Sequence, residues 1–125
     1  MSDTSSNQDL DLSFLYEIAD GSNEFIIESI DMLLQQTPEL LQAIGDAINA
    51  QDWPTAAGAA HKLKPSMGFF GMLISQELLQ EIELACKAGG NQPEQILAKF
   101  NDACDLINNN AGTLTRLRAE KEAEL

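Results

Sequence analysis

Apolar residues recur at helical spacing along almost the whole chain, and this pattern limits the possible folds more than any other feature. After Pro93, for example, the apolar residues Ile96, Phe100, Ala103 and Ile107 follow one another every three or four positions. Such spacing places them on one face of an α-helix. No segment alternates apolar and polar residues over five or more positions, as a half-buried strand does. The sequence therefore predicts an all-α protein.

Caps, glycines and prolines divide this pattern into helices with short connections. One apolar stripe continues in phase across Pro38, which predicts a single long helix kinked at the proline. Asp52 is placed to cap the following helix, and Gly71 lets the chain turn at its end. Long amphipathic helices with short connections indicate an antiparallel four-helix bundle. The predicted bundle helices cover about residues 23–50, 53–70, 72–87 and 93–118, and a short helix over residues 10–19 covers one end.

Length and charge indicate the domain organisation and exclude some partners. With 125 residues the chain makes one domain: a disordered lead over residues 1–9, the helical bundle over 10–118 and a charged tail over 119–125. A net charge of −13 repels nucleic acid and anionic membranes, so we expect neither as a partner.

Several features favour a cytoplasmic location. The chain has no apolar run of about 18 residues that would cross a membrane, and its polar opening differs from a signal peptide. Cys86 and Cys104 fall among apolar helical positions and lack any metal-binding spacing. We therefore expect reduced thiols in a cytoplasmic protein, with no metal site of its own.

The only histidine, His61, lies in the stretch of least ordinary composition. On a helix, the apolar residues around it gather on the side away from the imidazole, namely Ala56, Ala60, Leu63, Met67 and Phe70. The face of His61 itself carries small or cationic residues, namely Ala57, Lys64, Pro65 and Gly68, with Met72 near the edge. We therefore expect the imidazole to stand clear of its helix.

The residues around His61 resemble the signature of the histidine-containing phosphotransfer (HPt) domain. The matching segment reads Ala60-His61-Lys62-Leu63-Lys64-x-Ser66, followed by Gly71. Upstream residues agree in their order as well: Phe25, Leu33-Leu34, Pro38-Glu39, Leu41, Ala47 and Asp52. The likeness spans about residues 10–110 and implies a helical bundle that carries a phosphoryl group on its histidine.

The resemblance implies a phosphorelay intermediate. His61 would accept a phosphoryl group from the aspartyl phosphate of one receiver domain and pass it to the aspartate of another. The implied partners are receiver domains of response regulators and hybrid histidine kinases, and a monomer is expected. The protein would be a phosphocarrier without kinase activity of its own and without a cofactor, because the divalent metal is expected in the receiver. The chain indeed lacks a P-loop.

The residues near His61 suit this chemistry. A neutral imidazole is a good nucleophile near pH 7. Lys64, about 60° round the helix from His61, can reach phosphoryl oxygens, whereas Lys62 supplies positive field with less contact. On the neighbouring helix, either Glu83 or Gln80 can accept from Nδ1–H and leave Nε2 free.

A docking surface is expected around the histidine. Phe69 and Met72 lie nearest its face, and Leu15 and Ile18 of the first helix extend an apolar rim. Pro65 departs from the family pattern, which usually has glycine there, and should bend the helix. Small residues should leave the approach to His61 open, namely Ala57, Pro65 and Gly68.

Two other interpretations stay open at this point. The chain could be the phosphotransfer domain of a chemotaxis-type kinase, which takes its phosphoryl group from ATP bound to a separate domain. It could also be a helical interaction module whose histidine is incidental, in which case loss of His61 leaves binding and signalling unchanged.

Overall fold

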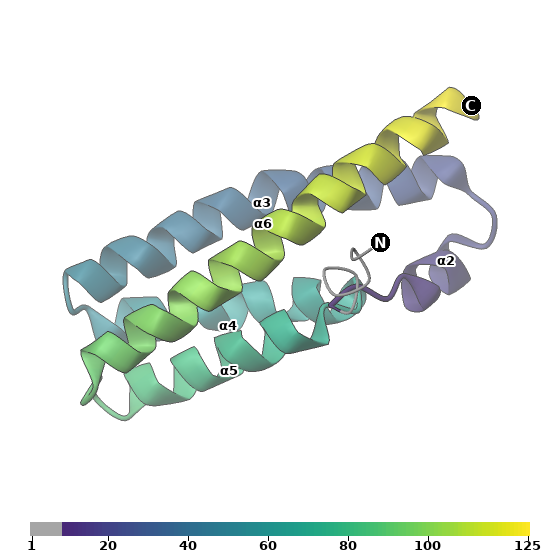
Figure 1. Cartoon of the computed structure of the whole chain (residues 1–125). Helices are drawn as coiled ribbons and strands as arrows, with labels where there is room; N and C mark the ends of the chain where they lie inside the picture. The colour runs from purple at the N-terminus through teal and green to yellow at the C-terminus, as the bar shows by residue number, and fades with distance from the viewer. Residues whose placement is uncertain (1–8) are drawn as a thin grey trace, which may run out of the picture.

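The computed structural model describes residues 9–125, and within that range the chain forms five α-helices and no strand (Figure 1). The helices are α2 (Ser13–Ala19), α3 (Asn23–Asn49), α4 (Trp53–Phe69), α5 (Leu73–Lys87) and α6 (Pro93–Ala123). Helix α3 packs against α4 and α6, and α5 packs against the same two helices. The four long helices thus form the predicted antiparallel bundle, and α2 lies against α3 at one end.

Side-chain caps set the starts of α3 and α4, and the cap at Asp52 was predicted from the sequence. The Ser22 side chain accepts a hydrogen bond from the Phe25 amide at 3.1 Å and so caps α3. The predicted single helix across Pro38 is confirmed, because α3 runs through it for 27 residues. The Asp52 carboxylate caps α4 by accepting from the Thr55 amide at 3.4 Å. Helix α4 likewise continues through Pro65 as far as Phe69.

Gly71 makes the turn between α4 and α5 possible. Its φ of +69° lies in the left-handed region that side chains disfavour. A Cβ atom there would also lie 2.1 Å from the backbone oxygen of Asp11. The segment before α2 therefore crosses directly over this turn, and only glycine leaves room for it.

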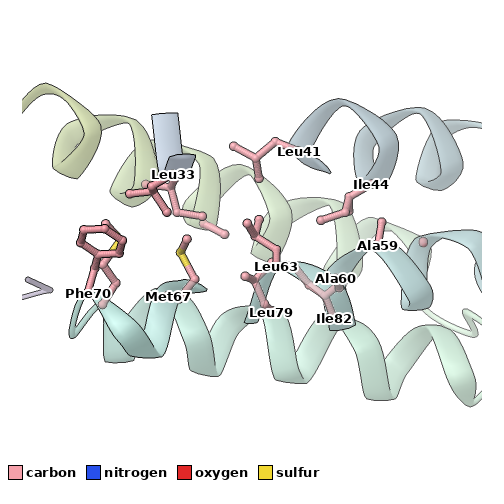
Figure 2. Close-up of a cluster of buried hydrophobic side chains, with 14 of the residues drawn as sticks. Leu33, Leu41, Ile44, Ala59, Ala60, Leu63, Met67, Phe70, Leu79 and Ile82 are labelled. Atoms are coloured by element: carbon pink, nitrogen blue, oxygen red, sulfur yellow. The ribbon is translucent and has the colours of Figure 1, made fainter. Parts of the chain in front are cut away.

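The core lies between the four long helices and centres on α4 (Figure 2). Leu63 and Met67 of α4 are completely buried, as are Leu79 and Ile82 of α5 and Ile44 of α3. This burial removes the predicted apolar face of α4 from water and turns the opposite face outward. Cys86 is buried and Cys104 partly buried, and neither forms a disulfide.

The N-terminal end of the described chain differs from the sequence prediction. Asp9, which the sequence placed in a disordered lead, is buried; the rest of that lead lies outside the described residues. At the other end, α6 continues into the charged tail as far as Ala123, and Arg118 pairs with Glu122 at 3.1 Å. Arg118 also pairs with Asp31, so the end of α6 lies beside α3, as Figure 1 shows. None of the helices in the described part is long and apolar enough to span a membrane.

Candidate functional site

His61 lies in the middle of α4 on the face turned away from the core. Its side chain is 67% exposed, whereas Ala60 and Leu63 on either side of it are completely buried. The helix that anchors His61 is fixed between α3 and α5. The imidazole is therefore an accessible group on a rigid support, as the helical spacing predicted.

Glu83 of α5 orients the imidazole. Its carboxylate is only 3% exposed, and Oε2 lies 3.0 Å from His61 Nδ1. An ionised carboxylate only accepts hydrogen bonds, so this contact assigns the proton to Nδ1 and leaves Nε2 with a free lone pair. Of the two acceptors that the sequence offered, the structure selects Glu83. Gln80 instead accepts a hydrogen bond from Lys64 Nζ.

Two lysines neutralise the negative charge of the buried Glu83 carboxylate. Lys64 Nζ lies 2.6 Å from Glu83 Oε1, and Lys87 Nζ lies 2.9 Å from Oε2. Burial alone raises the pKa of Glu83, but the two ammonium groups outweigh it and lower this pKa to about 2. Glu83 is therefore ionised throughout the physiological pH range and remains an acceptor for Nδ1–H.

The third lysine of this region, Lys62, is exposed and forms no hydrogen bond or salt bridge with any residue the structure describes. Together Lys62, Lys64 and Lys87 make a cationic patch around His61 in a chain of net charge −13. An anion that approaches the imidazole thus meets positive charge here.

An apolar groove begins one turn beyond His61, between α3 and the end of α4. It has a volume of about 350 Å³. Its lining includes Phe25, Met32, Pro65 and Phe69. The groove therefore contains two of the predicted docking residues, Pro65 and Phe69. Phe25 and Met32 were not predicted to contribute.

Helix α2 adds exposed apolar side chains beside this groove. Phe14 packs edge-to-face on Phe69 with ring centroids 5.4 Å apart, and Phe14 and Ile18 are each about half exposed. Of the predicted rim, Ile18 is therefore available at the surface. Phe14 was missed, although it lies four residues before Ile18 on the same face of α2.

Three of the predicted docking residues have buried side chains and present no surface of their own to a partner: Leu15, Ala57 and Met72. Leu15 points into the core from the inner side of α2. Met72 follows the turn at Gly71, so the angle obtained by continuing α4 no longer applies to it. The single methyl group of Ala57 sits at the edge of α4, where packing on both α3 and α5 widens the buried face.

Gly68 leaves space for the side chain of Gln76, a residue that the sequence analysis did not identify. A Cβ atom on Gly68 would lie 2.6 Å from Gln76 Nε2. The Gln76 amide lies in this space and donates to the Lys64 carbonyl at 3.2 Å. Gln76 precedes Gln80 by one turn of α5, a spacing that could have indicated a shared face toward α4.

A second polar cluster, which sequence reasoning also missed, joins the chain before α2 to α5 and α6. The buried Asp9 carboxylate accepts hydrogen bonds from the Ile74 amide at 2.6 Å and the Ser75 amide at 3.2 Å. It also accepts from the Ser75 hydroxyl and from Asn110 Nδ2. Asp9 thereby caps α5, whose own N-terminal residue Met72 supplies no side-chain cap.

Metal-ligating side chains do not gather at the site. Within residues 9–125, no group of three or more His, Cys, Asp or Glu side chains is placed to hold a metal ion. The polar groups linked to His61 through Glu83 are instead the ammonium groups of Lys64 and Lys87, and Lys64 also contacts the amide of Gln80.

Comparisons with known proteins agree with this geometry. The family model of the Hpt domain matches residues 28–120. The crystal structure of the HPT domain from an Hpt sensor hybrid histidine kinase from Shewanella is similar, with a TM-score of 0.75 and 23% sequence identity. The match covers 90% of this chain and 96% of that one. No curated protein matches the chain. The chain belongs to the Hpt domain family, the histidine phosphotransfer domains of two-component phosphorelays.

Proposed function

We propose that His61 is the phosphoacceptor and that it exchanges phosphoryl groups with receiver domains. The observation that carries the proposal is the exposed imidazole whose Nδ1 faces a buried, ionised Glu83. This contact leaves Nε2 as the nucleophile. Nε2 attacks the phosphorus of a receiver aspartyl phosphate, the bond from phosphorus to the aspartate oxygen breaks, and the aspartate leaves as carboxylate. Transfer onward to a second receiver reverses these events.

Lys64 is proposed to stabilise the phosphoryl group. It follows His61 by three residues on α4, and its ammonium already lies beside the carboxylate that holds Nδ1. Phosphoryl transfer proceeds through a loose transition state, so positioning and charge neutralisation supply most of the catalysis. Lys62, exposed on the same helix, adds positive field without a fixed contact.

The surface around His61 suits a receiver domain. Lys62 and Lys64, the two lysines of the cationic patch on the helix of His61, attract an acidic partner pocket, and the apolar groove beside them offers a surface that a partner can bury. Ile18, Pro65 and Phe69 are the predicted residues that remain available, and Phe14 and Met32 extend them. We propose that receiver domains of response regulators and hybrid histidine kinases dock here and bring the divalent metal that the transfer needs.

Phosphotransfer from a labelled receiver tests the proposal. A receiver that carries a labelled aspartyl phosphate should label the wild-type protein and leave His61→Gln unlabelled. The label should be acid-labile and alkali-stable, as expected for a phosphoramidate bond. A panel of receivers that all fail to label a folded wild-type protein would reject the relay role and favour a helical interaction module.

A further inference from the structure

Lys87 contacts the same carboxylate oxygen as the phosphoacceptor. It lies one turn after Glu83 on α5, and its Nζ is 2.9 Å from Oε2, the oxygen that faces His61 Nδ1 at 3.0 Å. A glutamate four residues before a lysine is the favourable order for a helical ion pair. Lys87 is therefore placed to act on the acceptor of Nδ1–H without touching the phosphoryl group.

The two lysines on Glu83 are held differently. Lys64 comes from the helix of His61, and its ammonium pairs with Oε1 at 2.6 Å. The Lys64 ammonium also donates to Gln80, so its interactions are divided between two acceptors. Lys87 shares the helix of Glu83, and its ammonium is paired with that carboxylate. Lys64, on the helix of His61, is therefore the cation that can turn to a group on the imidazole, whereas Lys87, one turn from Glu83 on α5, can remain beside the carboxylate although its side chain is 61% exposed.

Phosphorylation changes the charge balance of this cluster. A phosphoryl group brings about −1.5 to −2 charge and three strong acceptor oxygens. It attracts Lys64, and Glu83 then loses one of its two compensating cations. A buried carboxylate without a partner is strongly unfavourable and tends to protonate or turn to solvent, and either change removes the acceptor of Nδ1–H.

We propose that Lys87 is a positioning residue: it keeps Glu83 ionised and fixed against Nδ1 while Lys64 turns to the phosphoryl oxygens. The proposal rests on the proposed role of His61 as phosphoacceptor. It adds no chemical step, because the Nδ1 proton stays in place and only the partner of Lys64 changes. In this arrangement Lys64 neutralises charge on the phosphoryl group, and Lys87 neutralises the carboxylate that orients the imidazole.

Transfer kinetics give the first test. Lys87→Gln should lower the maximal single-turnover rate of transfer from a phosphorylated receiver by about fivefold, since a charge contact of this kind contributes on the order of 1 kcal/mol. The receiver concentration for half-maximal rate should stay within a factor of about two, because Lys87 positions and does not dock. Lys87→Arg should restore the rate. The matched control is Lys99→Gln, which removes a lysine paired with Glu81 at 3.0 Å and should leave the rate unchanged.

A second test needs no receiver, so it separates this proposal from the proposed function. The ¹⁵N shifts of the only imidazole report which of its two nitrogens carries the proton in the neutral ring. Lys64→Gln imitates the state in which Lys64 has left, and it should keep the Nδ1–H form. The double variant Lys64→Gln/Lys87→Gln should lose it in favour of the Nε2–H form that free imidazole side chains prefer.

Three results would overturn the assignment: an unchanged rate in Lys87→Gln, loss of the Nδ1–H form already in Lys64→Gln, or its retention in the double variant. A wild-type protein that no receiver labels would reject the proposed function instead. The tautomer series would still decide whether Lys87 holds Glu83 against the ring.

Discussion

Replacing Asp9 by alanine should cost more stability than its place before the first helix suggests. The Asp9 carboxylate is buried and is the only side-chain cap of α5 among the described residues. It also accepts from the Ser75 hydroxyl and from Asn110 Nδ2, both of which are buried. Asp9→Ala removes all of these acceptors at once.

The expected loss follows from the two kinds of contact. Removing an N-cap side chain costs about 1 kcal/mol. Leaving the buried Ser75 hydroxyl and Asn110 amide short of an acceptor costs about 1 kcal/mol each, although Asn110 keeps its bond to the Asp9 backbone oxygen at 3.1 Å. The free energy of unfolding should therefore fall by about 3 kcal/mol, and Tm should fall by about 10 °C.

Urea unfolding followed by circular dichroism at 222 nm measures this loss. Asp11→Ala is the matched control, because Asp11 precedes the short α2 and its exposed carboxylate accepts hydrogen bonds from the Ser13 amide at 3.0 Å and the Ser13 hydroxyl at 2.7 Å. The control should lose no more than about 1 kcal/mol. Equal losses in the two variants, or a change below about 0.5 kcal/mol in Asp9→Ala, would refute the reasoning that buried polar contacts tie this segment to the bundle.

Three further predictions concern the turn and the site. Gly71→Ala should lower the free energy of unfolding by about 2 kcal/mol or more, because the left-handed φ and the Asp11 backbone oxygen both oppose a Cβ; a urea midpoint equal to wild type would contradict this. Glu83 has a lowered pKa, so it contributes stability above its unfolded pKa of 4.5 and loses it as the pH falls toward about 2. Between pH 6 and pH 2.5 the wild type should therefore lose about 2 kcal/mol more than Glu83→Gln, a value reduced for solvent screening; parallel losses in urea titrations would count against the ion cluster. Glu83→Gln should also slow transfer to His61 about tenfold in single-turnover assays, because it removes the charge that fixes Nδ1–H, and an unimpaired rate would exclude an orienting role.

The parts of the fold that depend on neighbouring residues could be predicted from the sequence. Ser22 and Asp52 are residues that favour helix N-caps, and they mark the starts of α3 and α4. The apolar stripe that continues in phase across Pro38 predicts a single helix there. The exposure of His61 follows from the same periodicity, because an apolar stripe fixes the opposite face of its helix. The residues around His61 also indicated the Hpt family, and the match to the family model over residues 28–120 confirmed that resemblance.

The parts that depend on distant contacts could not be predicted. Asp9 looked like a disordered polar residue because its partners lie more than 60 residues away on α5 and α6. Met72 was assigned to the wrong surface because a turn at positive φ ends the helical phase. In a helix as short as α2, periodicity alone did not separate the buried Leu15 from the exposed Ile18.

Lys87 combines a local contact, which the sequence can indicate, with a distant one, which it cannot. The sequence analysis did not single out Lys87, although its spacing of four residues from Glu83 is typical of a helical ion pair; the structure shows that His61 contacts the same carboxylate. The position of the proposed phosphoacceptor could therefore be predicted from local sequence, whereas its contacts with Glu83 and the lysines depend on the packing of α4 on α5.

The most direct test of the account is the site of the phosphoryl group on the ring. Correlated ³¹P and ¹⁵N NMR on the protein phosphorylated by a receiver assigns the bond to one nitrogen of the only histidine. Because Nδ1–H is held by Glu83, the account predicts a bond from phosphorus to Nε2 with the proton retained on Nδ1. A bond to Nδ1, or a phosphoryl group on any residue other than His61, would contradict it.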